Sequence, residues 1–374
     1  MEAAGLRFVS SDGHVIEPPD LWTERIDRRF RDRAPHIEHR EKFDVFCVDG
    51  LSPFAGSDLG GVMATFKVEG RAIEDRTHNR KAEVRAGAYN PLSRLKDQDL
   101  DNVGAEVIYP GDALFLFAAP DLDYKHACIR AYNDWLIDFC SVAPDRLLGA
   151  AMLPIGGPIE AAVEEVRRVR KKGLRTVCIP CGHPKIPFGD PYYRSLFSEL
   201  QETGMPLSIH NAANEQQFAN IPTAAGGATI TFLENKYVDH FRTLTSLIAS
   251  GVAQAFPRLN FVIVEGGIGW VAAVLHTMDH WWEDHHLWLR PQLDEKPSFY
   301  CHRQFYFTFE EDRAGLLTRE LLNVDHLMWG SDYPHTEGTF PRSREQVAKD
   351  FAGLEPELVE KLVSNNCRQL YGLA

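Results

Sequence analysis

The chain has 374 residues, of which 44% are hydrophobic and 25% charged, and its formal net charge is −13. This composition is typical of a globular enzyme, and the length fits one α/β barrel with insertions. The acidic balance excludes non-specific binding to nucleic acid or to an anionic membrane surface. The first residues carry no basic segment followed by an apolar run, and no apolar run is long enough to span a bilayer. With an odd number of cysteines, 7 in all, we expect a cytoplasmic protein with free thiols.

Short runs rich in Val, Ile, Leu and Phe recur along the chain, and most precede a segment with helical periodicity. Nearly continuous apolar strands are typical of a parallel sheet that is buried on both faces. The helical periodicity is clearest in 124–143 and 159–172, where the apolar residues fall on one side. This alternation predicts a TIM-type (β/α)8 barrel, with a doubly wound open sheet as the alternative. The predicted strands are Leu6–Ser10, Ala105–Tyr109, Leu147–Leu153, Arg175–Ile179, Pro206–Ile209, Asn260–Val264, Gln304–Phe309 and His326–Trp329.

The segment between the first two predicted strands is longer than a minimal barrel needs. Residues 22–90 contain two strand-like pieces, Lys42–Val48 and Gly61–Val68, and a basic stretch around Arg76–Lys81. Loops that follow barrel strands surround the active-site mouth. We therefore predict a single domain over 1–374, in which the 22–90 insertion forms a lid over the mouth.

Histidines and carboxylates stand at the ends of three predicted strands. Asp12 and His14 follow the first, His210 follows the fifth and Asp332 follows the eighth. In Asp12-Gly13-His14 the alternate spacing points both side chains to the same side of an extended chain. Oxygen and imidazole ligands suit Zn²⁺, Mn²⁺ or Fe²⁺. Each motif alone is better explained by a helix cap, a turn residue or a buried histidine, but three strand ends together predict one divalent metal ion.

Several longer motifs accompany these residues. They are Ser11–Pro18, Arg130–Leu136, Pro144–Leu147, Pro206–His210, Gly251–Pro257 and Gly330–His335. Together they resemble the amidohydrolase-related family typified by aminocarboxymuconate-semialdehyde decarboxylase, within the amidohydrolase superfamily. The resemblance covers most of the chain. It implies a mononuclear divalent metal, often zinc and sometimes manganese.

The resemblance assigns the metal ligands with one departure. The family's histidine after the fifth strand falls on His210, its aspartate after the eighth falls on Asp332, and His14 is retained. Asp12 stands where the first of two histidines is usual, and Glu17 is a further possible ligand beside it. The added carboxylate favours a harder ion and weakens the expectation of zinc. We expect zinc, with manganese or iron as alternatives.

A second departure follows the sixth predicted strand, where family decarboxylases carry a histidine and this chain has Glu265. A carboxylate beside a metal-bound water can accept its proton. Alternatively, Glu265 orients His210 or caps the next helix. His335 can reach the same mouth, either to donate a proton or bind substrate oxygen or, alternatively, to brace its own turn.

The missing histidine favours hydrolysis as the first hypothesis. The chain would be a metal-dependent hydrolase of a small organic acid, amide or ring compound, with Glu265 or Asp332 as the base. The second hypothesis is a non-oxidative decarboxylase of an aromatic or unsaturated carboxylic acid, and the third is a metal-stabilised barrel that only binds. Asn211 and Trp270 are candidate substrate contacts. The amphipathic, aromatic stretch 281–288 predicts a homodimer.

Overall fold

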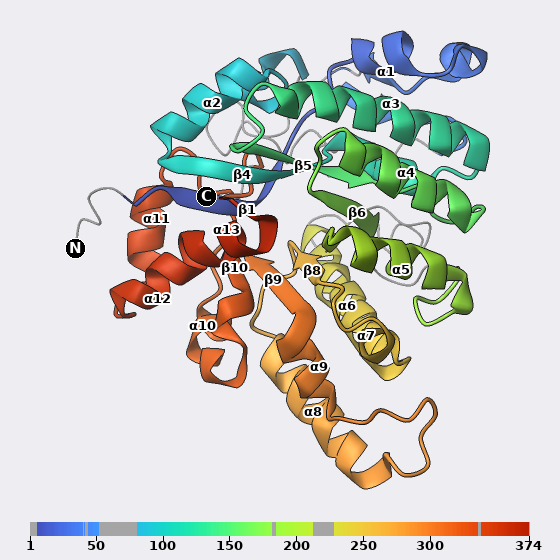
Figure 1. Ribbon diagram of the computed structural model, residues 1–374. Helices are drawn as coiled ribbons and strands as arrows, with labels where there is room; N and C mark the ends of the chain where they lie inside the picture. The colour runs from blue at the N-terminus through green and yellow to red at the C-terminus, as the bar shows by residue number, and fades with distance from the viewer. Residues whose placement is uncertain are drawn as a thin grey trace.

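The computed structural model describes residues 6–39, 41, 44–51, 81–181, 185–211, 228–335 and 338–373. Eight parallel strands form one sheet, and helices surround it on the outside (Figure 1). This architecture confirms the predicted (β/α)8 barrel. In sheet order the strands are β1 (Phe8–His14), β4 (Val103–Tyr109), β5 (Leu147–Met152), β6 (Thr176–Pro180), β7 (Leu207–His210), β8 (Phe261–Val264), β9 (Phe305–Phe309) and β10 (Leu327–Trp329).

Seven of the eight predicted strands end within one residue of the observed end, and the first is the exception. Strand β1 continues to His14, beyond the predicted end at Ser10. The reason lies across the barrel: the Ser11 hydroxyl donates to the carbonyls of Met328 and Trp329 at 3.1 and 2.9 Å. These bonds hold a polar stretch in extended conformation. Asp12 and His14 are therefore part of the strand and do not follow it.

The barrel closes between β1 and β10, just beyond the end of β10. An isolated parallel bridge joins Gly13 to Tyr333. The His14 amide donates to the Tyr333 carbonyl at 2.6 Å, and the Asp332 amide donates to the Asp12 carbonyl at 2.9 Å. A Cβ atom on Gly330 would lie 2.6 Å from Cβ of Asp12, so the close approach requires glycine. We call this β1–β10 contact the seam.

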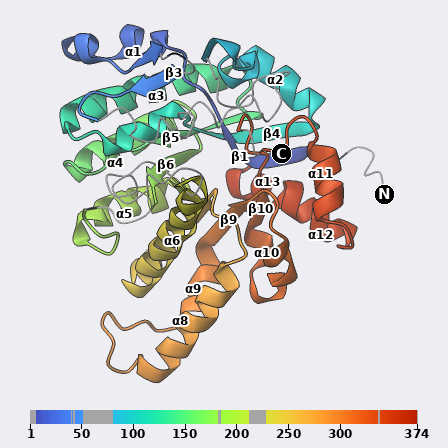
Figure 2. The ribbon, with the colours of Figure 1, turned by 180° about the vertical axis from the view of Figure 1, so that it is seen from behind.

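The helices form a ring outside the strands, as both views show (Figures 1 and 2). The predicted helices at 124–143 and 159–172 are confirmed as α3 and α4. No helix in the described part of the chain is long and apolar enough to cross a membrane. The helices outside the insertion are α2 (Pro91–Leu100), α3 (Leu122–Ser141), α4 (Ile159–Lys171), α5 (Arg194–Thr203), α6 (Ala228–Ala249), α7 (Val252–Ala255), α8 (Val271–His285), α9 (Pro297–Gln304), α10 (Arg313–Leu317), α11 (Ser343–Asp350), α12 (Pro356–Glu360) and α13 (Asn366–Tyr371).

The apolar core has two layers. A large cluster fills the space between the strands and the outer helices. A smaller one fills the barrel interior with side chains such as Val107, Ala150 and Val262, and it includes Cys367 and Tyr371 of α13. The C-terminal helix therefore contributes to the interior packing, and the barrel is a filled core that leaves the strand ends to form the site.

The insertion is described in part. Helix α1 (Asp20–Arg25) packs against α3, and strands β2 (His36–His39) and β3 (Asp44–Cys47) form an antiparallel pair. Strand β3 falls within the strand-like piece predicted at Lys42–Val48. The piece predicted at Gly61–Val68 lies outside the described residues, so the lid stays a prediction.

Candidate metal centre

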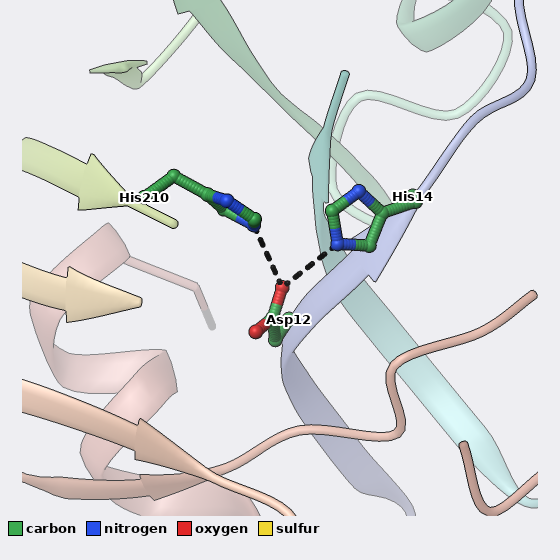
Figure 3. A group of neighbouring side chains, drawn as sticks. All are labelled: Asp12, His14 and His210. Carbon is green, nitrogen blue, oxygen red and sulfur yellow. Dashed lines mark ion pairs between the residues drawn. The ribbon is translucent and has the colours of Figure 1, made fainter. Parts of the chain in front are cut away.

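Four predicted ligands meet at the carboxyl ends of the strands, and all four side chains are buried. Nε2 of His14 lies 3.6 Å from Oδ1 of Asp12 and 3.4 Å from Oδ1 of Asp332. Nε2 of His210 lies 3.8 Å from the same Asp12 oxygen (Figure 3). Atoms bound about 2.0–2.2 Å from one ion lie roughly 3–3.5 Å from one another. These residues fall into two overlapping groups of neighbouring potential ligands that share His14. One group is Asp12, His14 and His210, and the other is His14, Asp332 and His335.

The backbone sets the tautomer of both histidines. Nδ1–H of His14 donates to the Pro110 carbonyl at 2.7 Å, and Nδ1–H of His210 donates to the Asn211 carbonyl at 2.6 Å. Each ring therefore presents an Nε2 lone pair to the centre, as a metal-binding histidine must. Among the described residues, neither Nε2 atom has a hydrogen-bond partner. The residues present thus fit a divalent ion.

The electrostatics of the cluster also favour a cation. Burial lowers the pKa of His14 well below its usual value, and His335 and His210 lower it further. Burial raises the pKa of Asp332 to about 7, with Glu265 and Asp12 adding to the rise against the opposing effect of His335. Burial disfavours a charged His210, but the neighbouring carboxylates outweigh it and raise that pKa. A divalent ion would take the place of these protons.

Two site carboxylates sit in strained turns after their strands. Glu265, the first residue after β8, has a φ of 59°, and Asp332, three residues after β10, has a φ of 52°. Residues other than glycine rarely adopt this left-handed conformation, which costs about 1–2 kcal/mol each. The Thr308 hydroxyl accepts the Glu265 amide at 2.8 Å and so holds the first turn in place. Such strain is concentrated at functional sites.

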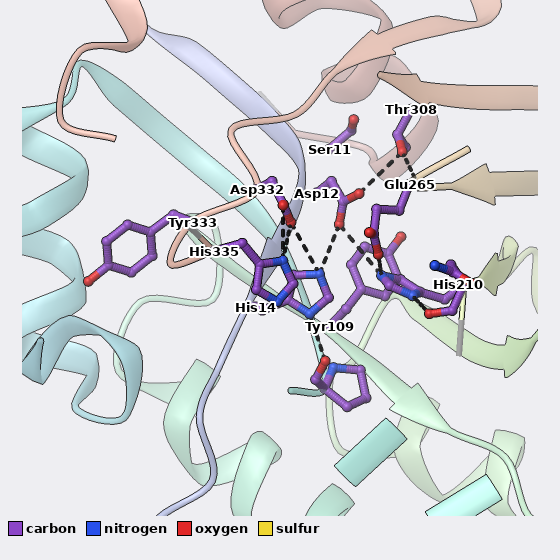
Figure 4. Close-up of polar contacts among 12 residues, drawn as sticks. Ser11, Asp12, His14, Tyr109, His210, Glu265, Thr308, Asp332, Tyr333 and His335 are labelled. Atoms are coloured by element: carbon purple, nitrogen blue, oxygen red, sulfur yellow. Dashed lines mark hydrogen bonds and ion pairs between the residues drawn. The ribbon is translucent and has the colours of Figure 1, made fainter. Parts of the chain in front are cut away.

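Glu265 and His335 lie beside the candidate ligands, Glu265 next to His210 and His335 next to His14 and Asp332 (Figure 4). Oε2 of Glu265 lies 3.6 Å from Nε2 of His210, and its side chain is 13% exposed. Nδ1 of His335 lies 2.8 Å from Oδ1 of Asp332, and its side chain is 14% exposed. The ring of His335 also lies 4.2 Å from the His14 ring, centre to centre. Both predicted catalytic side chains therefore border the ligand group.

Other predicted residues lie less directly at the centre. Glu17 is buried, and its Oε1 accepts the Gly111 amide at 3.0 Å; it is not among the described groups of neighbouring potential ligands. Trp270 donates from its indole nitrogen to the Gly266 carbonyl at 2.8 Å. Asn211 is nearly buried, and its backbone carbonyl orients His210.

The sequence interpretation missed two residues that touch the ligands. The Thr308 hydroxyl donates to Oδ2 of Asp12 at 3.4 Å. The Tyr109 ring lies 5.0 Å from that of His210, and its hydroxyl lies 3.0 Å from that of Ser208. Both occupy the ends of predicted strands, so the same strand-end argument would have found them.

The family profile described as Amidohydrolase matches residues 74–373, which is most of the chain. The chain belongs to the amidohydrolase family. This confirms the resemblance that the motifs predicted, and it agrees with a barrel whose mouth carries a histidine–carboxylate cluster.

Known proteins extend the comparison. A gamma-resorcylate decarboxylase of Rhodococcus jostii (strain RHA1) is 27% identical over 265 residues, which cover 64% of this chain and 76% of that protein. The crystal structure of amidohydrolase map2389c from Mycobacterium avium subsp. paratuberculosis K-10 superposes with a TM-score of 0.78 at 20% identity, covering 98% and 100% of the two chains. The crystal structure of a 5-carboxyvanillate decarboxylase from Novosphingobium aromaticivorans DSM 12444 is complexed with manganese and a nitrobenzoic acid. It superposes with a TM-score of 0.70 at 14% identity, covering 100% of this chain and 98% of that one.

Proposed function

We propose that this protein is a metal-dependent, non-oxidative decarboxylase of an aromatic carboxylic acid. The observation that carries the proposal is the buried cluster of Asp12, His14, His210 and Asp332 in a chain similar to a gamma-resorcylate decarboxylase. The sequence alone favoured hydrolysis. The relatives support the decarboxylase hypothesis better, because they include a gamma-resorcylate decarboxylase and a 5-carboxyvanillate decarboxylase.

The four buried side chains would hold the ion, with Nε2 as the donor atom of both histidines. A bound divalent ion supplies positive charge that attracts the carboxylate and an adjacent oxygen of the substrate. We propose manganese ahead of the zinc expected from the sequence. Carboxylate oxygens are hard ligands, and the 5-carboxyvanillate decarboxylase structure contains manganese.

Decarboxylation replaces carbon dioxide with a proton, so an acid must face the ring carbon. We assign this role to Glu265, which occupies the place of the family's histidine and lies beside His210. His335 would bind a substrate oxygen, because Asp332 orients its ring through Nδ1 and that ring borders His14 at a partly exposed position. Asn211 and Trp270 stay proposed substrate contacts.

The test measures carbon dioxide release from 2,6-dihydroxybenzoate and 5-carboxyvanillate by the Mn²⁺-loaded protein, with metal content determined in parallel. We expect about one metal ion per chain and measurable release. Glu265→Gln should abolish release with the metal retained, whereas His14→Ala should lose both. Activity that survives Glu265→Gln would remove Glu265 from the reaction.

Hydrolysis is the second candidate, because a partly exposed carboxylate beside the ligand group suits a general base. Assays on the same Mn²⁺-loaded protein distinguish hydrolysis from decarboxylation. Hydrolysis of amide or lactone substrates without carbon dioxide release would replace the decarboxylase proposal. Tight ligand binding without turnover of either kind would favour a binding barrel.

We further propose that the 22–90 insertion forms a lid over the barrel mouth.

We also propose that the protein is a homodimer. Helix α8 projects from the barrel in Figure 1, and Trp281, Leu287 and Trp288 on it and just after it are 61%, 74% and 65% exposed. A second copy of this chain would cover this apolar surface. Light scattering should show a dimer that Trp288→Asp weakens, and a monomeric wild-type protein would contradict it.

A further inference from the structure

A buried ion pair lies directly behind the ligands of β1. Arg94 on α2 and Glu106 on β4 have side chains that are 1% and 2% exposed. Nε of Arg94 lies 2.7 Å from Oε2 of Glu106, and Nη2 lies 2.7 Å from Oε1. Burying two charges has a large desolvation cost, and apolar side chains often stabilise a fold equally well. We therefore expect the Arg94–Glu106 ion pair to have a role beyond packing.

The guanidinium of Arg94 reaches the seam where the barrel closes. Its Nη1 donates to the His14 carbonyl at 2.8 Å, and the group stacks 4.2 Å from the centre of the Tyr333 ring. His14 is a proposed ligand, and Tyr333 follows the ligand Asp332. One rigid side chain thus contacts the backbone on one side of the seam and the neighbouring ring on the other.

The ion pair also explains the glycine between the two ligands of β1. A Cβ atom on Gly13 would lie 2.3 Å from Oε1 of Glu106 and 3.2 Å from Nη2 of Arg94. The backbone between Asp12 and His14 therefore rests directly on the paired charges. A shift of the ion pair would move both ligands.

Helix α2 supports the other side of the seam through a second contact. The Tyr333 hydroxyl donates to Oδ2 of Asp97 at 2.7 Å. Asp97 is held in turn by Arg85, whose Nε and Nη2 donate to its two oxygens at 2.9 and 2.7 Å. Arg94 and Asp97 lie one turn apart on α2, so one helix contacts both sides of the seam.

We propose that Arg94 is a positioning residue for the metal centre. It sets the spacing between the β1 ligands and Asp332 across a seam that lacks a regular ladder of hydrogen bonds. Metal affinity, and not stability alone, then depends on its forked geometry, because ligands must be held within about 0.5 Å of the productive arrangement. The inference rests on the proposed metal site.

The test compares Arg94→Lys with wild type by calorimetric titration of the metal-free full-length protein with Mn²⁺, well below the melting temperature. Lysine keeps the charge but cannot bind Glu106 bidentately while reaching the His14 carbonyl. We expect the dissociation constant to rise at least about tenfold, as for other residues that orient ligands. Carbon dioxide release at saturating Mn²⁺ should fall as well.

Asn133→Ala is the matched control. Asn133 is buried on α3 and bonds to the backbone of Met152 and to Glu165, away from the seam. Its loss should lower the melting temperature while the dissociation constant for Mn²⁺ stays at the wild-type value. This separates a loss of stability from a loss of positioning.

Two further outcomes decide the inference. If Arg94→Lys melts earlier but binds Mn²⁺ as wild type does, the ion pair is only structural and the inference is wrong. If Arg94→Lys does not fold, Glu106→Gln takes its place: it keeps the shape of the partner and removes the charge that holds the guanidinium of Arg94, and unchanged affinity there also refutes the inference. A wild-type protein that binds no Mn²⁺ would instead overturn the proposed function, and this inference with it.

Discussion

Replacing Asp332 with asparagine should stabilise the metal-free protein at high pH. The carboxyl is buried near Asp12 and Glu265, and burial raises its pKa from 3.8 to about 7. The folded state therefore holds a proton that the unfolded state has lost, and stability falls as pH rises from about 4 to about 7. Asparagine has the same shape, carries no charge and tolerates the left-handed φ of 52°.

The expected change in the free energy of unfolding follows from the pKa shift of Asp332. Each pH unit inside the window corresponds to about 1.4 kcal/mol, so the step from pH 5 to pH 7 amounts to at most about 3 kcal/mol. Relaxation and water entry reduce this figure in real proteins. We expect the stability difference between Asp332→Asn and wild type to grow by about 1–3 kcal/mol over this range.

The assay is urea unfolding of both proteins after treatment with a chelator, at pH 5 and pH 8. Groups distant from Asp332 titrate alike in the two proteins and cancel in the difference, which therefore reports Asp332 together with the groups it interacts with, His335 above all. A difference that stays constant or shrinks between the two pH values would refute the reasoning. Adding Mn²⁺ at pH 8 should stabilise wild type strongly and the variant little, because the variant has lost a ligand.

Three more predictions concern the surroundings of the cluster. Mn²⁺ affinity should rise with pH between 6 and 8, because the ion displaces the proton of Asp332, whose pKa is about 7; titration in two buffers of different ionisation enthalpy measures the released proton. Thr308→Val should lower the free energy of unfolding by about 1–2 kcal/mol and weaken Mn²⁺ binding, since the Glu265 amide loses its acceptor; urea unfolding and Mn²⁺ titration test it. Tyr109→Phe should lower the free energy of unfolding by about 1 kcal/mol, through loss of the contact with Ser208, without changing the affinity, as the same two measurements would show.

The barrel, and the meeting of the four candidate ligands at its mouth, could be predicted because both depend on local patterns. Apolar runs mark strands that are buried on both faces, and the ends of parallel strands meet at one mouth. The predicted end of β1 at Ser10 was wrong because the polar stretch from Ser11 to His14 lacks the apolar pattern of a strand. The hydroxyls of Ser10 and Ser11 bond to β10 and the residues after it, more than 300 positions away, and no local pattern shows such a contact.

The ion pair behind the candidate ligands could not be predicted from the sequence for a similar reason. Arg94 and Glu106 are separated by 12 positions, and a charged residue on a helix normally indicates a solvated face. Only the folded structure shows that the guanidinium turns inward to the seam. The need for glycine at position 13 likewise comes from Glu106, because its side chain occupies the space that a Cβ atom would take. Glu106 lies outside the Asp12-Gly13-His14 motif, so the motif alone does not show this need.

Charge balance links the two departures from the family pattern to the reaction. Asp12, Glu265 and Asp332 would together carry three negative charges, which one divalent ion cannot neutralise. An anionic substrate adds a fourth, and a buried site with excess negative charge is costly unless it takes up a proton. We assign that proton to Glu265, because the ion would displace the proton of Asp332, whereas Glu265 lies beside His210 outside the proposed ligand set. A protonated Glu265 is an acid and not a base, so the carboxylate that first suggested hydrolysis suits proton delivery to the ring carbon after carbon dioxide leaves.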